Sequence, residues 1–410
     1  MRQIKLTAPT DTIGAVITLP SSKSICNRAL IMHALSGDKN TIGNLSDCDD
    51  THVMLRALQD MPEVIDIMAA GTAMRFLTAY LAVTEGEHLI TGTERMKQRP
   101  IRILVDALRT LGADITYAEE DGFPPLHIKG RTLMKSEVSL PGNVSSQYIS
   151  ALLLIGPMLR QGLKLTLTGE IVSRPYINLT LQLMQVFGAQ AAWTSSNQLE
   201  VKAMPYQHTP FTVESDWSAS SYWYEIVSLS EKATVELPAL FANSFQGDSK
   251  VAELFAGLGV HTRFENHKVI LERIERKLER MEYDFVNQPD LAQTFVVTCA
   301  MLNIPFRFTG LQSLKIKETD RISALITELK KLGFVLTETD GSILSWNGER
   351  CEAESSPAID TYEDHRMAMA FAPAILRLKE LRINNPQVVS KSYPHYWENL
   401  KDAGFGILEE

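Results

Sequence analysis

The stretch "LVDALRTLGADI" at residues 104–115 sets the pattern on which the whole chain is built. Its leucines recur at helical spacing with charged residues between them, which predicts an amphipathic surface helix. Gly112 comes directly after the last leucine, and glycine is favoured there because it adopts a left-handed backbone without steric cost. The residues that follow predict a strand. The segment is therefore a helix, a glycine stop and a strand.

This segment returns four more times. The copies are "LTLQLMQVFGAQA", "VAELFAGLGVHT", "LITELKKLGFVL" and "WENLKDAGFGI", with stops at Gly188, Gly259, Gly333 and Gly404. From Gly112 onward the glycines are separated by 76, 71, 74 and 71 residues, a spacing too even for chance. A degenerate first copy, "HVMLRALQDMPEVI", has Pro62 at its stop.

A second type of helix recurs with the same period. It is short, apolar on nearly all sides and begins with small or polar residues, as expected for a helix inside a core. Strand-like runs such as "EVSL", "KLTLTG", "ATVEL" and "KVILE" join the two helix types. The chain thus has six units, each with one surface helix and one buried helix. The buried copies are "SSKSICNRALIMHAL", "GTAMRFLTAYLAV", "SSQYISALLLIG", "SASSYWYEIVSL", "DLAQTFVVTCAML" and "DHRMAMAFAPAIL".

Six units in 410 residues predict two α/β domains with three units each, because one core of the usual size serves about 100–200 residues. The run "PYQHTPFTVES" at 205–215 marks a crossing between them. The strand before Pro20 fits either half by pattern. We assign it to the second half, which gives a discontinuous domain of residues 1–20 and 215–410 and an inserted domain of residues 21–214.

The composition limits the function. A net charge of −9 argues against a general binder of nucleic acids or membrane surfaces, which would need a basic field. The four cysteines lie far apart without metal-ligand spacing, which fits a reducing cytoplasm. The start of the chain lacks a signal peptide's apolar region, and the most apolar stretch, 149–159, is about half of a membrane span. We expect a cytoplasmic protein.

Candidate site residues gather where the buried helices begin. A helix start presents unpaired N–H groups and the positive end of the dipole, so several converging starts would bind anions. Each of these residues alone is more often an ordinary helix cap or a solvated charge. Their equivalent places in a repeat favour a shared anion site. They are Lys23, Ser24, Arg28, Gly71, Thr72, Arg75, Ser145, Ser146, Gln147, Asp290, Asp364, His365 and Arg366, with Arg99, Ser173, Arg174, the run "KIKETDR" at 315–321 and Lys391 on flanking loops.

Seven motifs taken together resemble the EPSP synthase family, the 3-phosphoshikimate 1-carboxyvinyltransferases. They are "SSKSICNRAL", "AGTAMR", "RMKQRPI", "SSQY", "VSRPYI", "KIKETDR" and "DHRMAMAF", in family order from about Leu19 to Tyr396. The resemblance implies a two-domain inside-out α/β barrel in which each domain has three βαβαββ repeats, with the active site in the cleft between domains. It implies a monomeric enzyme of the shikimate pathway to chorismate and aromatic amino acids.

The implied reaction needs no metal or cofactor. The 5-hydroxyl of shikimate 3-phosphate adds to C2 of phosphoenolpyruvate, C3 takes a proton, and phosphate then leaves the tetrahedral intermediate. Both substrates are polyanions, which gives the basic residues a use. The carboxylates would move the protons.

The resemblance also assigns residues to roles. Asp290 would take the hydroxyl proton and Glu318 would handle the proton at carbon, with Lys23 counted among the catalytic groups. Gln147 and Lys23 would reach both substrates. The residues implied for shikimate 3-phosphate are Ser24, Arg28, Ser145, Ser146, Ser173, Tyr176, Asp290, Ser313 and Lys317; those for phosphoenolpyruvate are Gly71, Arg99, Arg321, Arg366 and Lys391.

Some positions depart from the family pattern, and rival functions remain open. Ala69, Phe76, Ser313, Lys315 and Ser21 stand where the family commonly has Asn, Pro, Asn, Arg and Gly, which bears on affinity more than on the reaction.

The sister transferase acting on UDP-N-acetylglucosamine typically has a cysteine in the loop at 90–100, and this chain has none there. A relative acting on RNA 3′-phosphates and a non-catalytic polyanion-binding scaffold are two further rival functions.

Overall fold

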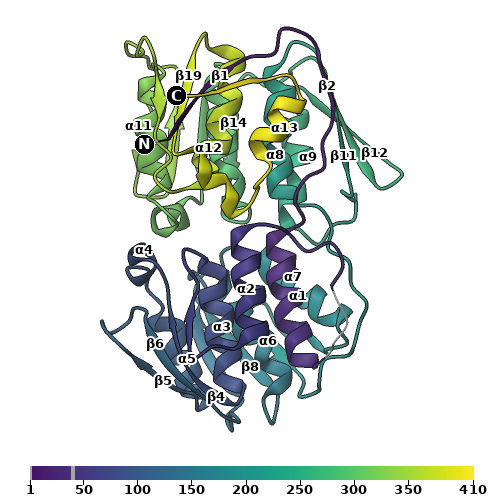
Figure 1. Cartoon of the computed structure of the whole chain (residues 1–410), viewed down its shortest axis with the longest axis vertical. Coiled ribbons are helices and arrows are strands. Elements are labelled where there is room, and N and C mark those ends of the chain that lie inside the picture. Colours follow the sequence, from purple (N-terminus) through teal and green to yellow (C-terminus); the bar gives the residue numbers. More distant parts are fainter. Residues whose placement is uncertain (1, 38–41) are drawn as a thin grey trace. The chain divides into compact units, whose positions relative to one another are not determined.

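The computed structural model describes residues 2–37 and 42–410, which divide into two compact units. Unit 1 comprises Met1–Pro20 and Glu214–Glu410, and unit 2 comprises Ser21–Val213 (Figure 1). The junction lies one residue before the one expected from the sequence. The mixed α/β fold class predicted from the repeats is confirmed in both units.

Unit 2 is built from helices and short strands that alternate along the chain. Its elements are α1 (Lys23–Ser36), α2 (Asp49–Asp60), β3 (Val64–Asp66), α3 (Gly71–Val83), β4 (Gly86–Thr91), α4 (Glu94–Lys97), α5 (Arg102–Leu111), β5 (Asp114–Tyr117), β6 (Leu126–Gly130), β7 (Glu137–Pro141), α6 (Ser146–Ile155), the 3-10 helix η1 (Gly156–Met158), β8 (Leu163–Thr168), α7 (Arg174–Val186), β9 (Ala191–Trp193) and β10 (Gln198–Val201).

Two four-stranded sheets of unit 2 share one topology. Their strand orders are β3-β4-β6-β5 and β7-β8-β10-β9. In each sheet the first two strands are parallel and joined by a buried helix, whereas the last two complete antiparallel pairs. Each is therefore one βαβαββ repeat. The preceding repeat has α1 and α2, and an isolated parallel bridge joins Gly43 to Thr212.

Unit 1 combines the start of the chain with its second half. Its elements are β1 (Gln3–Thr7), β2 (Ile13–Val16), α8 (Trp217–Leu229), β11 (Ala233–Pro238), η2 (Gly247–Lys250), α9 (Val251–Ala256), β12 (Val260–Glu265), β13 (Lys268–Arg273), β14 (Met281–Asp284), η3 (Pro289–Leu291), α10 (Ala292–Met301), β15 (Phe306–Thr309), η4 (Gln312–Ile316), α11 (Arg321–Lys331), β16 (Thr337–Thr339), β17 (Ile343–Trp346), β18 (Ala358–Ile359), α12 (His365–Phe371), η5 (Ala372–Arg377), β19 (Leu381–Asn384), η6 (Pro386–Lys391), α13 (Tyr396–Asp402) and β20 (Gly406–Glu409).

Three four-stranded sheets surround the core of unit 1. Their orders are β12-β13-β11-β2, β14-β15-β17-β16 and β18-β19-β1-β20. Strand β2 pairs in parallel with β11, and β1 lies between β19 and β20. The first 20 residues thus supply strands to two sheets of this unit, which is why they belong to it.

The predicted helix stops are confirmed. Gly112, Gly188, Gly259, Gly333 and Gly404 all have positive φ angles, between 80° and 110°. At the degenerate first copy Met61, directly before Pro62, has the left-handed backbone, with φ of 40°. A residue with a side chain adopts this conformation less readily than glycine does.

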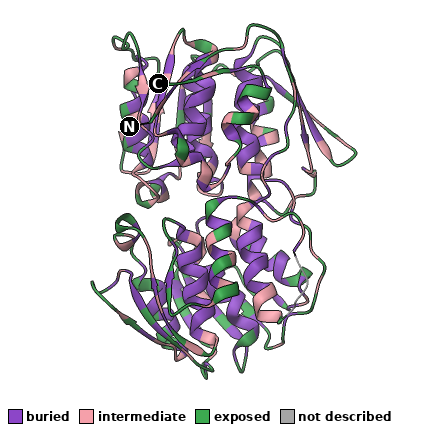
Figure 2. Ribbon diagram, viewed as in Figure 1, coloured by how far each residue is buried: buried purple, intermediate pink, exposed green. Residues whose placement is uncertain are grey.

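The six predicted buried helices form the cores of the two units (Figure 2). Every residue of α8, α10 and α12 is buried except Ser218. The predicted surface helices expose one face, as α5 does while it buries Leu104, Leu108 and Leu111. Among the described residues, the helices are all too short or too polar to cross a membrane.

Candidate active site

In unit 1, the segments that precede or open the buried helices bring seven charged side chains together. Asp290 lies in η3 just before α10, Lys317 and Glu318 lie between η4 and α11, and Arg321 is the first residue of α11. The others come from the start of α12, where Asp364 caps the helix and Arg366 follows, and from Lys391 at the end of η6.

Asp290 is held by three cations. Its Oδ2 is 2.9 Å from Nη2 of Arg366, and its Oδ1 is 3.3 Å from Nη1 of Arg321 and 3.5 Å from Nζ of Lys317. Burial raises the pKa of the Asp290 carboxyl, but the charges of the three cations together lower it by more, so that the pKa lies well below its usual range. Asp290 is therefore ionised at neutral pH.

Glu318 bridges two cations. Its Oε2 accepts a hydrogen bond from Nη2 of Arg321 at 3.0 Å, and its Oε1 lies 3.0 Å from Nζ of Lys391. Its side chain is 15% exposed, so it is partly shielded from water but still reachable. In the run "IKETDR" Asp320 acts as an ordinary helix cap, because its carboxylate accepts from the Ser323 backbone N–H. The motif therefore combines a cap with charged residues of the cluster.

Asp364 is a member of the cluster to which the family resemblance assigned no role, although its position at a helix start made it a candidate site residue. It is fully buried, and its two oxygens accept from Nε and Nη2 of Arg321 at 2.7 and 3.4 Å. It also accepts from the backbone N–H of Arg366, which caps α12. Burial lowers the pKa of Arg321, but Asp364, Glu318 and Asp290 raise it by more, so this guanidinium stays charged. The "DHR" motif was the available signal, since it placed Asp364 beside Arg366.

The cluster of unit 1 holds four cations against three carboxylates. Lys317, Arg321, Arg366 and Lys391 each contact at least one carboxylate, so the positive charge is mostly compensated within the unit. Such a group of carboxylates beside cations can move protons next to a bound anion. Ser313, in η4, is half-buried, and no hydrogen bond of the described residues joins it to this cluster.

Unit 2 contains a buried arginine without a carboxylate partner among the described residues. Arg28, on α1, is 3% exposed and donates to Oγ1 of Thr180 at 2.7 Å, Oγ of Ser150 at 3.2 Å and the Tyr176 carbonyl at 3.4 Å. Burial lowers the pKa of Arg28 to about 10. The arginine joins α1 to α6 and α7, a role that the sequence did not reveal. Its uncompensated charge would be stabilised by an anion.

The start of α3 is close to Arg99. A Cβ atom on Gly71 would lie 2.6 Å from Nη1 of Arg99, so a side chain at this position would displace the end of the arginine. Gln147 donates from Nε2 to Oγ1 of Thr72 at 3.0 Å, which links the starts of α3 and α6. The structure thus brings Gly71, Arg99, Thr72 and Gln147 into one neighbourhood.

The remaining predicted residues of unit 2 lie at helix starts. Lys23, the first residue of α1, forms an ion pair with Asp50 of α2 at 3.1 Å, a partner that the sequence did not indicate. Ser145 caps α6 weakly, accepting from the Gln147 backbone at 3.4 Å. Ser173, before α7, has a left-handed backbone with φ of 55°. Ser24, Ser146 and Tyr176 are half-buried in the first turns of α1, α6 and α7.

Comparison with known proteins identifies the family. A family profile described as EPSP synthase (3-phosphoshikimate 1-carboxyvinyltransferase) matches residues 7–67 and 59–400. The chain belongs to the EPSP synthase family. It is 65% identical over 402 residues to the 3-phosphoshikimate 1-carboxyvinyltransferase of Bacteroides fragilis, covering 98% of both chains, and 35% identical to that of Photobacterium damsela subsp. piscicida, covering 96% of this chain and 97% of the other.

Solved structures carry the same fold. An EPSP synthase from Acinetobacter baumannii superposes with a TM-score of 0.78 at 22% identity and covers all of both chains. A second structure of the enzyme from that organism gives a TM-score of 0.77. The family's two-domain α/β architecture therefore extends over the whole chain.

The structure gives the contacts of two residues that depart from the family pattern, Phe76 and Lys315. Phe76, on α3, is 1% exposed, and the guanidinium carbon of Arg28 lies 5.3 Å from the centre of its ring. This cation–π contact stabilises the arginine's charge in a buried place. Lys315 forms an ion pair with Glu338 instead of joining the charged cluster. The Phe76 departure thus acts on a predicted substrate-binding residue.

Proposed function

We propose that this chain transfers the enolpyruvyl group of phosphoenolpyruvate to the 5-hydroxyl of shikimate 3-phosphate, releasing phosphate. The reaction forms a bond between the hydroxyl oxygen and C2 and places a proton on C3. Loss of phosphate from C2 and of a proton from the methyl group then restores the double bond. The observation that supports this assignment most is the charged cluster of unit 1 in a chain of the EPSP synthase family.

We assign the proton transfers to Asp290 and Glu318. Both carboxylates lie beside cations, and each cation can hold a substrate oxygen as well as its carboxylate. When a dianion binds to Lys317 and Arg366, it offsets part of the positive charge that lowers the pKa of Asp290. That pKa then rises, which makes Asp290 a stronger base for the hydroxyl proton at the moment of reaction.

The residues of unit 2 would bind rather than transfer protons. We propose that Arg28, with Ser24, Ser145, Ser146, Ser173 and Tyr176, binds shikimate 3-phosphate, and that Arg99 and the start of α3 bind phosphoenolpyruvate. The case for Arg28 is physical. A buried guanidinium without a carboxylate partner gains more from a phosphate than an exposed one does, because charge-assisted hydrogen bonds strengthen away from water. Lys23 and Gln147 complete this set.

A phosphate-release assay with different acceptors tests the proposal. The chain should release phosphate from phosphoenolpyruvate when shikimate 3-phosphate is present, and neither substrate alone should suffice. UDP-N-acetylglucosamine should not replace the acceptor. If phosphate were released with UDP-N-acetylglucosamine as the acceptor and not with shikimate 3-phosphate, the chain would have the activity of the sister transferase. If both anions bound without any release of phosphate, a non-catalytic scaffold would be favoured.

We further propose that the enzyme works in the cytoplasm as a monomer. A reducing compartment suits the four free cysteines, three of which are buried. Sedimentation of the purified chain at several concentrations tests the oligomeric state, and a concentration-dependent increase in mass would contradict it.

A further inference from the structure

A pocket of about 520 Å³ in unit 1 is lined by three arginines. It lies at the C-terminal end of α10, where Met301, Leu302 and Asn303 form one wall, and Arg377 at the end of η5 lines another. Helix α10 has 10 residues, so this end is about 15 Å from the one beside Asp290. The pocket is therefore separate from the charged cluster of the candidate active site. Its lining residues are Arg273, Glu275, Arg276, Met301, Leu302, Asn303 and Arg377.

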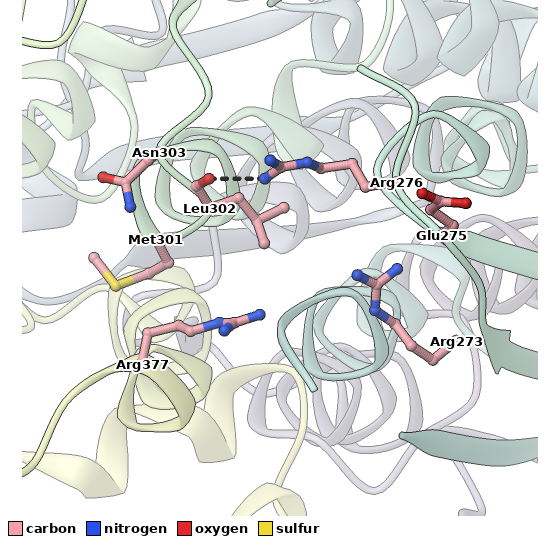
Figure 3. Close-up of a pocket in the computed structure, with 7 residues that line it drawn as sticks. All are labelled: Arg273, Glu275, Arg276, Met301, Leu302, Asn303 and Arg377. Atoms are coloured by element: carbon pink, nitrogen blue, oxygen red, sulfur yellow. Dashed lines mark hydrogen bonds between the residues drawn. The ribbon is translucent and has the colours of Figure 1, made fainter. Parts of the chain in front are cut away.

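Two of the arginines have a structural role that uses part of their donors. Arg273 donates from Nε to the carbonyl of Ser230, after the end of α8, at 3.0 Å and from Nη1 to the carbonyl of Gly259 at 2.8 Å. Arg276 donates from Nη1 to the Leu302 carbonyl at 2.8 Å (Figure 3). These bonds satisfy carbonyls at helix ends, as basic side chains commonly do there. The Nη2 groups of both arginines take no part in them.

The third arginine, Arg377, does not cap a helix-end carbonyl as the other two do. The Arg377 side chain forms no hydrogen bond or ion pair within residues 2–37 and 42–410, and Figure 3 shows its guanidinium extending into the pocket from the side opposite Arg273. Burial lowers the pKa of Arg273, and the charges of Arg377 and Arg276 lower it further. The three guanidiniums thus repel one another across the pocket. Glu275 is the one acidic residue among the seven that line it.

We propose that this pocket binds a small phosphate-bearing anion, held by Arg377 together with the free donors of Arg273 and Arg276. A phosphate presents oxygens to several planar guanidinium groups at once, and arginine is well suited to that arrangement. The volume exceeds that of a bare phosphate, and the mostly buried Met301 and Leu302 supply an apolar surface for a short carbon chain. Free phosphate and a small phosphomonoester share the required chemistry.

Methionine methyl resonances give a local test, because Met301 lines the pocket. The full chain is labelled at the methionine methyl groups, the Met301 signal is assigned with Met301→Leu, and inorganic phosphate is titrated at constant ionic strength against chloride. The Met301 signal should shift to saturation with phosphate and not with chloride. A parallel titration with glycerol 3-phosphate separates the sources: tighter binding of the ester assigns the site to a phosphomonoester, and equal binding assigns it to phosphate.

Charge variants decide whether the arginines cause the binding. Arg377→Gln should weaken the phosphate affinity seen at Met301 by about tenfold, because one charge-assisted contact is lost. Glu275→Gln should tighten it severalfold by removing the opposing charge. Arg307→Gln, at an exposed arginine of β15, is the matched control and should change nothing. The proposal is overturned by a Met301 shift that chloride reproduces, or by one that neither Arg377→Gln nor Glu275→Gln alters.

Discussion

Replacing Glu318 by glutamine should abolish most of the turnover without weakening substrate binding. In the structure Glu318 contacts Arg321 and Lys391 at 3.0 Å each, inside a cluster of four cations and three carboxylates. Glutamine keeps the size of the side chain but cannot take a proton from carbon or return one. Loss of a general acid–base group lowers turnover by about 10²–10⁴-fold, equal to about 3–5 kcal/mol of barrier.

The direction of the KM change distinguishes this role from a structural one. Glu318→Gln removes one of three negative charges, so the cluster becomes more positive and should attract both anionic substrates at least as well. We therefore expect kcat to fall while the KM values stay constant or decrease. A disturbed site would instead raise the KM values together with the loss of kcat.

Steady-state phosphate release measures both parameters. Glu338→Gln is the matched control, because Glu338 also pairs with a lysine, Lys315, but stands outside the charged cluster. It should leave kcat within about twofold, as expected for a surface ion pair. A kcat for Glu318→Gln within tenfold of the unmodified chain would refute the role assigned to this carboxylate.

Three further predictions concern binding and stability. Arg28→Ala should weaken the binding of shikimate 3-phosphate alone by about tenfold or more, which calorimetry measures. Lys391→Ala should mainly raise the KM for phosphoenolpyruvate, which steady-state kinetics measures. An equal loss of shikimate 3-phosphate binding in both variants would contradict these separate roles. Asp364→Asn should lower the free energy of unfolding by about 3 kcal/mol, because the buried charge of Arg321 then faces one carboxylate fewer. Denaturant unfolding measures this change, and a decrease of less than about 1 kcal/mol would contradict the expected role of Asp364. Burial raises the pKa of Glu225 well above its usual range, so the unfolded chain loses this proton at lower pH than the folded chain does, and Glu225 costs stability as pH rises above about 4.5. Glu225→Gln should therefore stabilise the protein more at pH 8 than at pH 5, by about 1 kcal/mol or more, and a pH-independent difference would contradict it.

The repeat was predictable from the sequence because its signals are local. An amphipathic helix, a glycine stop and an all-apolar helix each depend on residues within one turn or two, so Gly112 and Gly333 are recognisable as stops from the sequence alone. The strands "EVSL" and "KVILE" are recognisable for the same reason. The two-domain α/β class followed from counting these units.

The pairing of charges could not be predicted, because it depends on which helix starts meet in space. The sequence placed Glu318 between Lys317 and Arg321, yet the folded chain pairs it with Arg321 and with Lys391, which is distant along the chain. Asp364 was visible in its motif, but its contact with Arg321 was not. The family resemblance supplied candidate residues and no partners.

Arg28 illustrates the same limit in unit 2. The motif marked it as a substrate-binding residue, and nothing local indicated that it would be buried among α1, α6 and α7 and lie against the ring of Phe76. In the sequence Phe76 stood out only as a departure from the family pattern. Its effect on the arginine arises only when two buried helices pack together.

The most direct test of the proposed enolpyruvyl transfer is to run the reaction in deuterium oxide and examine the product by nuclear magnetic resonance. Addition of the hydroxyl to C2 must place a solvent deuteron on C3, and elimination then removes either a proton or a deuteron from the resulting methyl group. We expect release of phosphate together with an enolpyruvyl ether of shikimate 3-phosphate that carries deuterium at its vinyl carbon. A product formed without any deuterium at that carbon, or phosphate released without the ether, would contradict it.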